Sequence, residues 1–245
     1  MLCPVAWEVK LSIFIKPNWP VPDNVCAATT TCANLNLAHY VDDQSEQVMI
    51  NRRRLREQLN LPNEPIWLNQ QHSIEVINLG RENHNLSVDG SYTNKANIVC
   101  AVLTADCLPI LLCSSDGKEI AVLHAGWRGL LNGIIAKGRR HFRCESREIF
   151  AWLGPAISQQ AFEVGSEVRE AFIQHNVRAA EAFHPSKNAD HWMMDIYQLA
   201  RQQLNQLGVN KIYGGDFCTY SNQERFYSYR RDGQTSRMAS LIWRG

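Results

Sequence analysis

The sequence lacks a surplus of charge of either sign, and it lacks any long run of apolar residues. Its 245 residues carry a formal net charge of +1, which offers no electrostatic basis for binding nucleic acid or an anionic membrane surface. The apolar run at residues 11–15 is too short for the core of a secretory signal, and no run approaches the roughly 18 residues of a membrane span. We therefore predict a cytoplasmic protein with no nucleic-acid partner and no membrane partner.

Metal-binding motifs of fixed spacing are also missing. The chain has eight cysteines and eight histidines, but it contains no Cys-x-x-Cys, no His-Glu-x-x-His and no His-x-His pair. The cysteine spacing is irregular and nothing indicates an oxidising compartment, so we predict mostly free thiols rather than a disulfide framework. Any metal ligands must therefore come from separate parts of the chain.

The composition predicts one well-packed domain. Hydrophobic residues make up 45% and charged residues 20% of the chain, which suits a sizeable core and argues against disorder. No internal repeat, low-complexity tract or linker divides the sequence, so residues 1–245 are predicted to form a single domain. Strand and helix patterns are mixed without strict alternation, which is typical of a compact α/β or α+β fold.

The apolar pattern gives the expected elements. Alternating or continuous apolar runs predict strands over residues 9–15, 26–32, 65–68, 73–79, 98–103, 120–123, 149–153, 211–213, 226–230 and 238–243. Helical spacing predicts helices from Asp42 or Asp43 to Leu59, from Gly129 onward, over residues 165–175 and over residues 195–207. Residues 80–90 are polar and are predicted to form a loop.

Two neighbouring strands each end on a residue that can bind a metal. Cys107 follows the strand at residues 98–103, and His124 follows the strand at residues 120–123. Strand ends are common places for functional sites, and a thiolate with an imidazole suits zinc or copper. A catalytic zinc usually has three protein ligands, and His72, after an earlier predicted strand, is the best third candidate. A buried structural cysteine with two hydrogen-bonded histidines would explain the same residues.

Further polar residues flank this pair. Asp106 lies next to the cysteine and could act as a general base or orient a ligand, or it could cap a turn. Arg128, in a Gly-x-x-Gly loop before a predicted helix, could hold an anion or bind strand-end carbonyls. Arg230 and Arg231 could face the same cleft. Cys218 could approach the metal, but a free core thiol explains it better.

Six sequence blocks occur together in the order found in one protein family. They are TADCLPILL at residues 104–112, HAGWRG at 124–129, AWLGPAI at 151–157, FEVG at 162–165, GGDFCT at 214–219 and YSYRRD at 227–232. With these blocks the chain closely resembles the bacterial laccase-domain proteins, also described as purine nucleoside phosphorylases of the multicopper polyphenol oxidase type. The resemblance implies an α/β fold of layered mixed β-sheets flanked by helices. It also implies a zinc site formed by His72, Cys107 and His124.

The resemblance further implies an enzyme. Family members are described as phosphorylases of adenosine, inosine, guanosine and methylthioadenosine and as adenosine deaminases; a related role is the editing of peptidoglycan precursors by removal of a misincorporated serine. The expected partners are therefore purine nucleosides and phosphate, and the expected cofactor is zinc, with copper as the alternative. Zinc and Arg128 would orient phosphate, while Asp106 would shuttle a proton or orient a ligand.

Some features differ from the family pattern. The family's glycine-rich loop is several residues shorter here, at residues 29–34, and its arginine is missing, which predicts a reduced cavity wall. Ser73 replaces the glycine that follows the ligand histidine, and residues 88–90 read Val-Asp-Gly instead of Ala-Asp-Ala. A copper oxidase would need a cluster of further histidines, which the scattered histidines do not suggest. A non-enzymatic metal-binding module is a further alternative.

Overall fold

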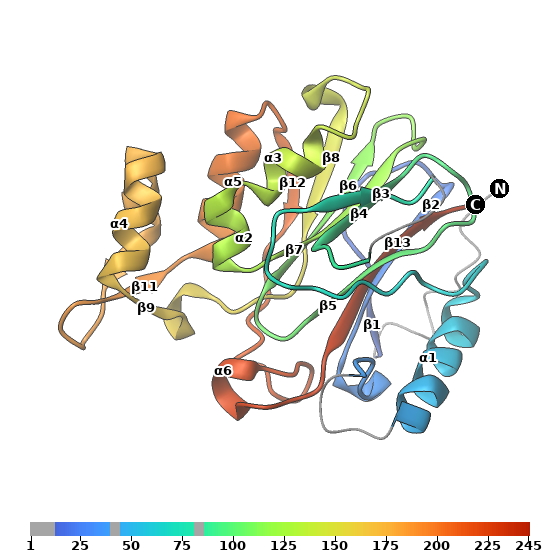
Figure 1. Cartoon of the computed structure of the whole chain (residues 1–245), viewed down its shortest axis with the longest axis horizontal. Coiled ribbons are helices and arrows are strands. Elements are labelled where there is room, and N and C mark those ends of the chain that lie inside the picture. Colours follow the sequence, from blue (N-terminus) through green and yellow to red (C-terminus); the bar gives the residue numbers. More distant parts are fainter. Residues whose placement is uncertain (1–12, 40–44, 81–85) are drawn as a thin grey trace.

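Two β-sheets lie face to face at the centre of the molecule (Figure 1). A computed structural model of the chain describes residues 13–39, 45–80 and 86–245. The larger sheet has the strand order β12 (Lys211–Gly214), β8 (Ile149–Leu153), β6 (Leu108–Ser114), β7 (Ile120–Ala125), β4 (Gly90–Thr93) and β3 (Val76–Asn78). The smaller sheet has the order β1 (Phe14–Ile15), β2 (Val25–Thr30), β13 (Met238–Arg244) and β5 (Cys100–Thr104).

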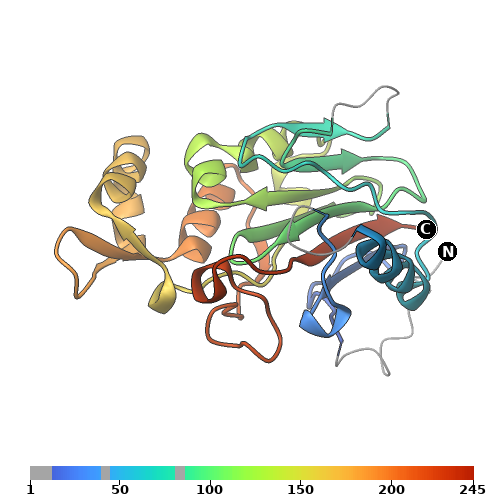
Figure 2. The same ribbon diagram turned by 60° about the horizontal axis from the view of Figure 1, so that its bottom comes forward.

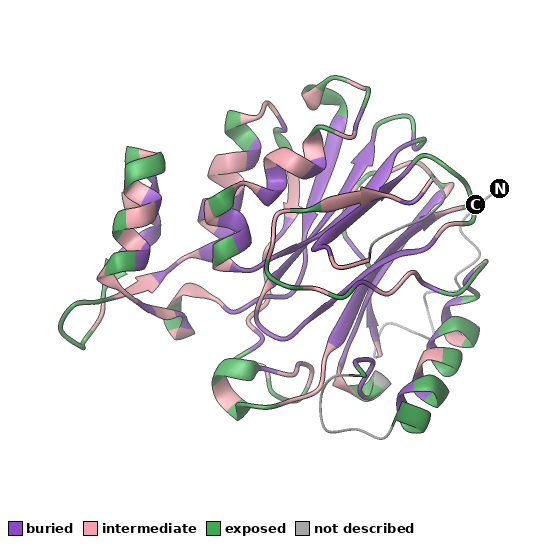
Figure 3. Ribbon diagram, viewed as in Figure 1, coloured by how far each residue is buried: buried purple, intermediate pink, exposed green. Residues whose placement is uncertain are grey.

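The central strands of these sheets bury both of their faces. Along β6, Leu111 and Cys113 pack between the two sheets, whereas Ile110 and Leu112 belong to the core on the helix-covered side. Figure 3 shows the strands buried along most of their length. This two-sided burial explains why the sequence has continuous apolar runs here, since a strand with one wet face would alternate.

Helices cover the outer face of each sheet. The helices on the six-stranded sheet are α2 (Trp127–Asn132), α3 (Ile134–Arg139) and α5 (Ile196–Gln206). The four-stranded sheet is covered by α1 (Ser45–Leu59), which contributes Leu55 and Leu59 to the core. These layers confirm the predicted α/β fold of mixed sheets flanked by helices.

A smaller unit extends from one end of the main body (Figure 2). Its sheet has the strand order β10 (Phe183–Pro185), β11 (His191–Met194) and β9 (Glu163–Gly165), and it carries helix α4 (Ser166–His175). Short helical turns connect the larger elements: η1 (Cys32–Asn34), η2 (Ser146–Glu148), η3 (Gln159–Ala161), η4 (Val177–Ala182) and α6 (Tyr229–Asp232).

Two predicted strands are wrong. Residues 226–228 form a loop and residues 229–230 begin α6, because the Ser228 hydroxyl accepts a hydrogen bond from the backbone N of Arg231 and so caps this helix. Residues 65–68 make only an isolated bridge to β5 at Ile66. The sequence pattern also missed β4, which begins at the end of the predicted 80–90 loop. The cap predicted at Asp42 or Asp43 lies outside the described residues.

The structure also bears on two further predictions, which concern disulfides and membrane-spanning segments. The free cysteines of the described segments are Cys32, Cys100, Cys107, Cys113, Cys144 and Cys218. Cys26 is disulfide-bonded and is the exception to the mostly free thiols that the sequence predicted for the described cysteines. Among the described segments, no helix is both long enough and apolar enough to cross a membrane.

Candidate metal centre

His72, Cys107 and His124 meet at one end of strands β5, β6 and β7. Cys107 lies in the short connection through which the chain passes from β5 in the smaller sheet to β6 in the larger one. His124 is on β7, opposite Pro109 at the start of β6, so the antiparallel register places it beside this connection. His72 comes from the loop before β3. The structure thus brings together the three residues that the sequence suggested.

The ligand atoms of these residues are close enough to share one ion. All lie within 4.8 Å of one another, and Cys107 Sγ is 3.7 Å from His72 Nε2. The two imidazole rings are nearly perpendicular, with centroids 4.8 Å apart and an interplanar angle of 74°. One sulfur and two imidazole nitrogens, with a cavity beside them, match the donor set of a three-ligand zinc site with an open fourth position. Within the described ranges, no other set of three or more such side chains is so placed.

Asp89, which the sequence analysis did not single out, fixes the orientation of one histidine. His124 Nδ1 donates to Asp89 Oδ1 at 2.7 Å, and the Asp89 carboxylate is fully buried. This bond keeps the proton on Nδ1 and leaves Nε2 as the atom that can bind a metal. The arrangement is the carboxylate–histidine pair common at zinc sites.

Asp89 also holds the loop that carries the second histidine. It accepts bonds from the backbone N of Gln71 at 3.1 Å, of His72 at 2.9 Å and of Ser73 at 2.6 Å. The Ser73 hydroxyl adds a bond of 2.7 Å, which the glycine expected at this position could not make. His72 has a φ of +57°, a left-handed conformation that costs energy for a residue with a Cβ. These bonds oppose that cost and keep the His72 ring at the site.

The electrostatics of the metal-free site favour a thiolate beside an imidazolium. Burial raises the pKa of the Cys107 thiol, but the neighbouring His124 and His72 outweigh it and lower this pKa to about 6. Burial lowers the pKa of His124, but Cys107 and Asp89 raise it to about 9. Burial also raises the pKa of Asp89, and hydrogen bonds from His124 and Ser73 lower it to about 2. A metal ion that binds here would meet a thiolate and would displace a proton from His124.

A cavity of about 490 Å³ opens beside the three residues. This volume lies in the range of small-molecule sites. Its apolar and aromatic wall includes Leu103, Trp127, Ile157, Phe162, Ile196 and Tyr229. Its charged wall consists of Asp106, Arg128, Arg230 and Arg237 together with the two histidines of the metal site. The arginines outnumber the single carboxylate, so the cavity is suited to a ligand with an aromatic part and an anionic part.

Comparison with known proteins assigns the chain to a family. Residues 25–245 match the family model described as multi-copper polyphenol oxidoreductase laccase. The chain belongs to this laccase family. A Haemophilus influenzae protein named purine nucleoside phosphorylase is 45% identical over 239 residues, covering 94% of this chain and 98% of that protein. Purine nucleoside phosphorylase YfiH of Escherichia coli is 46% identical over 243 residues, covering 95% and 99% of the two chains.

Solved structures agree with the assignment to the laccase family. A Neisseria meningitidis protein superposes with a TM-score of 0.88 at 41% identity, covering 94% of this chain and 98% of that chain. YlmD from Geobacillus stearothermophilus superposes with a TM-score of 0.80 at 26% identity, covering 95% and 96%. The predicted membership and fold are therefore confirmed.

Among the other predicted site residues of this laccase-family chain, two arginines line the cavity, whereas Arg231 and Cys218 do not. Arg128 and Arg230 line the cavity, as the sequence suggested. Arg231 instead turns into the C-terminal loop, where it donates to the carbonyl oxygens of Thr219, Tyr220 and Phe226. Cys218 is outside the metal-site group and accepts weak bonds from the backbone N of Ser158 and Ser221.

Residues 29–34, where the family loop is shortened, are not among the residues that line the cavity. Thr29 and Thr30 lie on β2, where Thr29 bonds Ser240 of β13. Cys32 supports the C-terminal loop instead: its N donates to the Arg225 carbonyl, and its own carbonyl accepts from the Tyr227 hydroxyl. The segment therefore braces a loop that reaches the cavity at Tyr229 and Arg230.

Selective alkylation would test the charge state of the metal-free site. After chelation, we expect iodoacetamide to modify Cys107 with a rate that rises through about pH 6 rather than pH 9, because the thiolate is the nucleophile. Peptide mass spectrometry across the pH range measures this rate. Cys100 and Cys113 serve as internal controls, since burial raises the pKa of each to about 12. Zinc should protect Cys107, and a midpoint near pH 9 would contradict the prediction.

Gly126 leaves room for the metal ligands. A Cβ at this position would lie 3.0 Å from Cys107 Sγ and 3.1 Å from His72 Cδ2. Its φ of −67° suits any residue, so Gly126→Ala would disturb the ligands without straining the backbone. We expect roughly tenfold weaker zinc binding, the lower end of the effect seen when groups that orient ligands are changed.

A competition titration with a chromophoric chelator measures this change in zinc affinity. Gly129→Ala is the matched control, because a Cβ there meets its nearest neighbours only at 3.5 Å. Unchanged zinc affinity in Gly126→Ala, with normal affinity in the control, would contradict the expected crowding.

Proposed function

We propose that this protein is a zinc-dependent purine nucleoside phosphorylase that also deaminates adenosine. The observation that carries the proposal is the group of His72, Cys107 and His124 in the wall of a cavity that also contains Arg128. Relatives at about 45% identity named purine nucleoside phosphorylase support the phosphorylase reaction. The substrate set proposed is adenosine, inosine, guanosine and methylthioadenosine.

The residues that hold the metal have distinct parts in this proposal. His72, Cys107 and His124 supply one ligand atom each, and Asp89 keeps His124 in the tautomer that exposes Nε2. When bound, zinc lowers the pKa of water toward neutrality and acts as a Lewis acid. Copper fits the same donors, so the metal is part of the test below.

The cavity wall supplies the binding steps of phosphorolysis. A phosphate oxygen forms a bond to C1′ of the ribose as the bond from C1′ to N9 of the purine breaks. The electron pair of that bond leaves with the base, which takes up a proton. Arg128 binds the phosphate through charge-assisted hydrogen bonds, and the aromatic side chains of Trp127, Phe162 and Tyr229 pack against the purine.

Deamination uses the same cavity without phosphate. Water adds to the purine carbon that carries the amino group, and ammonia leaves. The partly apolar wall excludes bulk water from the purine, while the arginine side remains available for the polar end of the substrate. Both carboxylate oxygens of Asp106 accept hydrogen bonds, from Thr219 and from Ser228 with Arg230, and these bonds support an orienting role for Asp106 rather than a proton shuttle.

Product analysis with measured metal content tests the proposal. Purified protein is incubated with inosine and phosphate, and separately with adenosine alone, and its metal is determined by mass spectrometry. We expect hypoxanthine with ribose 1-phosphate from the first reaction, inosine from the second, and about one zinc per chain. Stoichiometric copper with phenol oxidation would overturn the proposal in favour of an oxidase. Zinc without turnover on nucleosides would leave a hydrolase of cell-wall precursors or a binding module.

A further inference from the structure

The two cavity arginines Arg128 and Arg230 keep hydrogen-bond donors free to bind a ligand. The Arg128 guanidinium lies 4.4 Å from the centroid of the Trp127 ring, and no described residue accepts a hydrogen bond from it. Arg230 lies 5.3 Å from the centroid of the Phe162 ring, and it gives a single bond, from Nη1 to the Glu163 carbonyl at 2.9 Å. A guanidinium has five N–H donors, so most of them remain available.

Within the described part of the chain, neither arginine forms an ion pair, although the charge of Arg230 helps to lower the pKa of the Glu163 carboxyl. The ion pairs there do not include Arg128 or Arg230. Both arginines are exposed, and both line the cavity. Arg237, the third cavity arginine, already donates to the carbonyl oxygens of Thr235 and Ser236. Two arginines with free hydrogen-bond donors in a cavity beside the candidate metal centre point to an anion with several oxygens.

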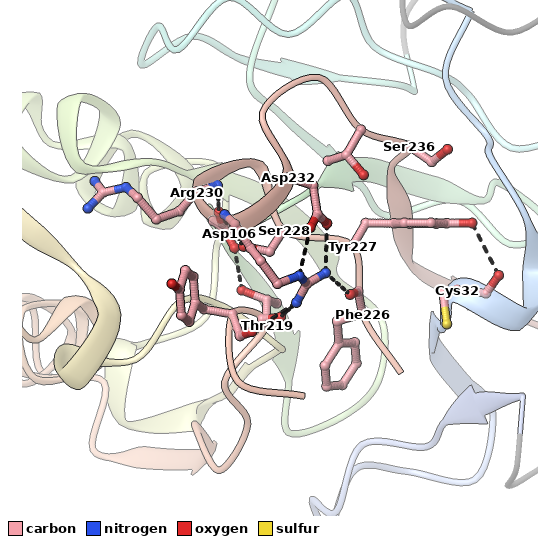
Figure 4. Close-up of polar contacts among 12 residues, drawn as sticks. Cys32, Asp106, Thr219, Phe226, Tyr227, Ser228, Arg230, Asp232 and Ser236 are labelled. Atoms are coloured by element: carbon pink, nitrogen blue, oxygen red, sulfur yellow. Dashed lines mark hydrogen bonds and ion pairs between the residues drawn. The ribbon is translucent and has the colours of Figure 1, made fainter. Parts of the chain in front are cut away.

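Asp106 ties the loop of Arg230 to the metal site. Its Oδ1 accepts from the Thr219 hydroxyl at 2.6 Å, and its Oδ2 accepts from the Ser228 hydroxyl at 3.0 Å and from the backbone N of Arg230 at 2.7 Å. Figure 4 shows these bonds converging on Asp106 while the Arg230 side chain extends away from it.

The Asp106 carboxylate therefore holds the start of α6 through Ser228 and Arg230, and it holds the loop at Thr219 as well. Asp106 has a φ of +87°, and it is 8% exposed. It also precedes Cys107 directly in the chain. Asp106 therefore links the position of Cys107, a candidate metal ligand, to the position of Arg230.

We propose that Arg128 and Arg230 form a clamp for a phosphate group at the mouth of the cavity, and that Asp106 is the positioning residue for Arg230. The clamp rests on the proposed function for its substrate, since phosphorolysis needs phosphate next to the nucleoside. Two guanidinium groups that line one cavity also suit a phosphate carried by a nucleotide.

Phosphate binding without turnover tests the clamp. Inorganic phosphate is titrated into the zinc-loaded protein by calorimetry, and inosine 5′-monophosphate is titrated in a second arm. We expect Arg230→Gln to weaken phosphate binding about tenfold and Arg230→Lys to weaken it less, because lysine keeps the charge but not the planar fork. Arg147→Gln, on the exposed helix η2 outside the cavity, is the matched control.

A double-mutant cycle tests the role of Asp106. If Asp106 acts through Arg230, Asp106→Asn weakens phosphate binding in the wild-type background and adds nothing in Arg230→Gln. Zinc content and the circular dichroism spectrum are measured on each variant, and Arg230→Lys keeps the test valid should a variant misfold. A full effect of Asp106→Asn in the Arg230→Gln background would overturn the positioning role.

The outcomes separate the clamp from the proposed reaction. Weaker binding of inorganic phosphate supports a co-substrate clamp, and weaker binding of the nucleotide alone supports a clamp for a phosphorylated substrate. Unchanged binding of both ligands in Arg230→Gln overturns the clamp. A protein whose phosphate affinity depends on Arg230 but which does not split inosine would refute the phosphorylase proposal and leave the clamp standing.

Discussion

Cys107→Ala is expected to abolish zinc binding and turnover while leaving the fold intact. The substitution removes the only sulfur among the three ligands and leaves two imidazoles, too few for a tight catalytic zinc site. Cys107 lies in a connection between strands and is only partly buried, so we expect the free energy of unfolding of the metal-free protein to change by no more than about 1 kcal/mol. Metal content, turnover of inosine and urea unfolding are measured together.

Cys218→Ala is the matched control for this experiment. Cys218 is also a half-buried free thiol, but it lies outside the group that can share a metal. The control should retain zinc and activity. Full turnover in a folded, metal-free Cys107→Ala variant would remove the metal from the mechanism altogether.

Asp89→Asn is expected to damage both the metal site and the fold. The carboxylate is fully buried and accepts bonds from His124, from the Ser73 hydroxyl and from three backbone N–H groups. An amide offers one acceptor oxygen and turns an NH2 group toward these donors. We expect a loss of roughly 2–4 kcal/mol in unfolding free energy and a 10- to 100-fold loss of zinc affinity.

The pH dependence of stability gives Asp89→Asn a second readout. The pKa of Asp89 in the folded protein, about 2, lies below its ordinary value of 3.8. Its contribution to stability is therefore complete above about pH 4 and is lost as the pH falls toward 2. In the metal-free wild-type protein, urea midpoints should fall across this window, and the variant should show a flatter profile. Asp190→Asn, in an exposed loop, is the control; equal slopes in wild type and Asp89→Asn would contradict the assignment.

The layered fold was predictable because its strands are buried on both faces. The apolar runs that form β5, β7, β8 and β13 can be recognised as strands from their composition alone. β4 reads Gly-Ser-Tyr-Thr, so its strand character comes from pairing with β3 and β7 rather than from its own residues. The aromatic run at residues 226–230 misled the analysis in the opposite direction, because capping by Ser228 and Asp106 decides its conformation.

The candidate site was predictable in its ligands but not in their support. His72, Cys107 and His124 could be proposed from strand ends, and the family resemblance gave them weight. Asp89 could not be assigned from spacing, because its partners Ser73 and His124 meet it only once β4 has paired with β7. The one local signal for Asp89 was its position as a carboxylate directly before β4.

The position of β13 has a consequence for how the chain folds. This strand lies between β2 and β5 and pairs with both, so Thr29 meets Ser240 across most of the sequence. Contacts of such large sequence separation form slowly, because a long loop must close before they contribute. Until residues 238–244 arrive, β2 and β5 each present an open edge that can pair with other chains. We therefore expect refolding to be limited by insertion of β13, with aggregation as the competing process at high protein concentration.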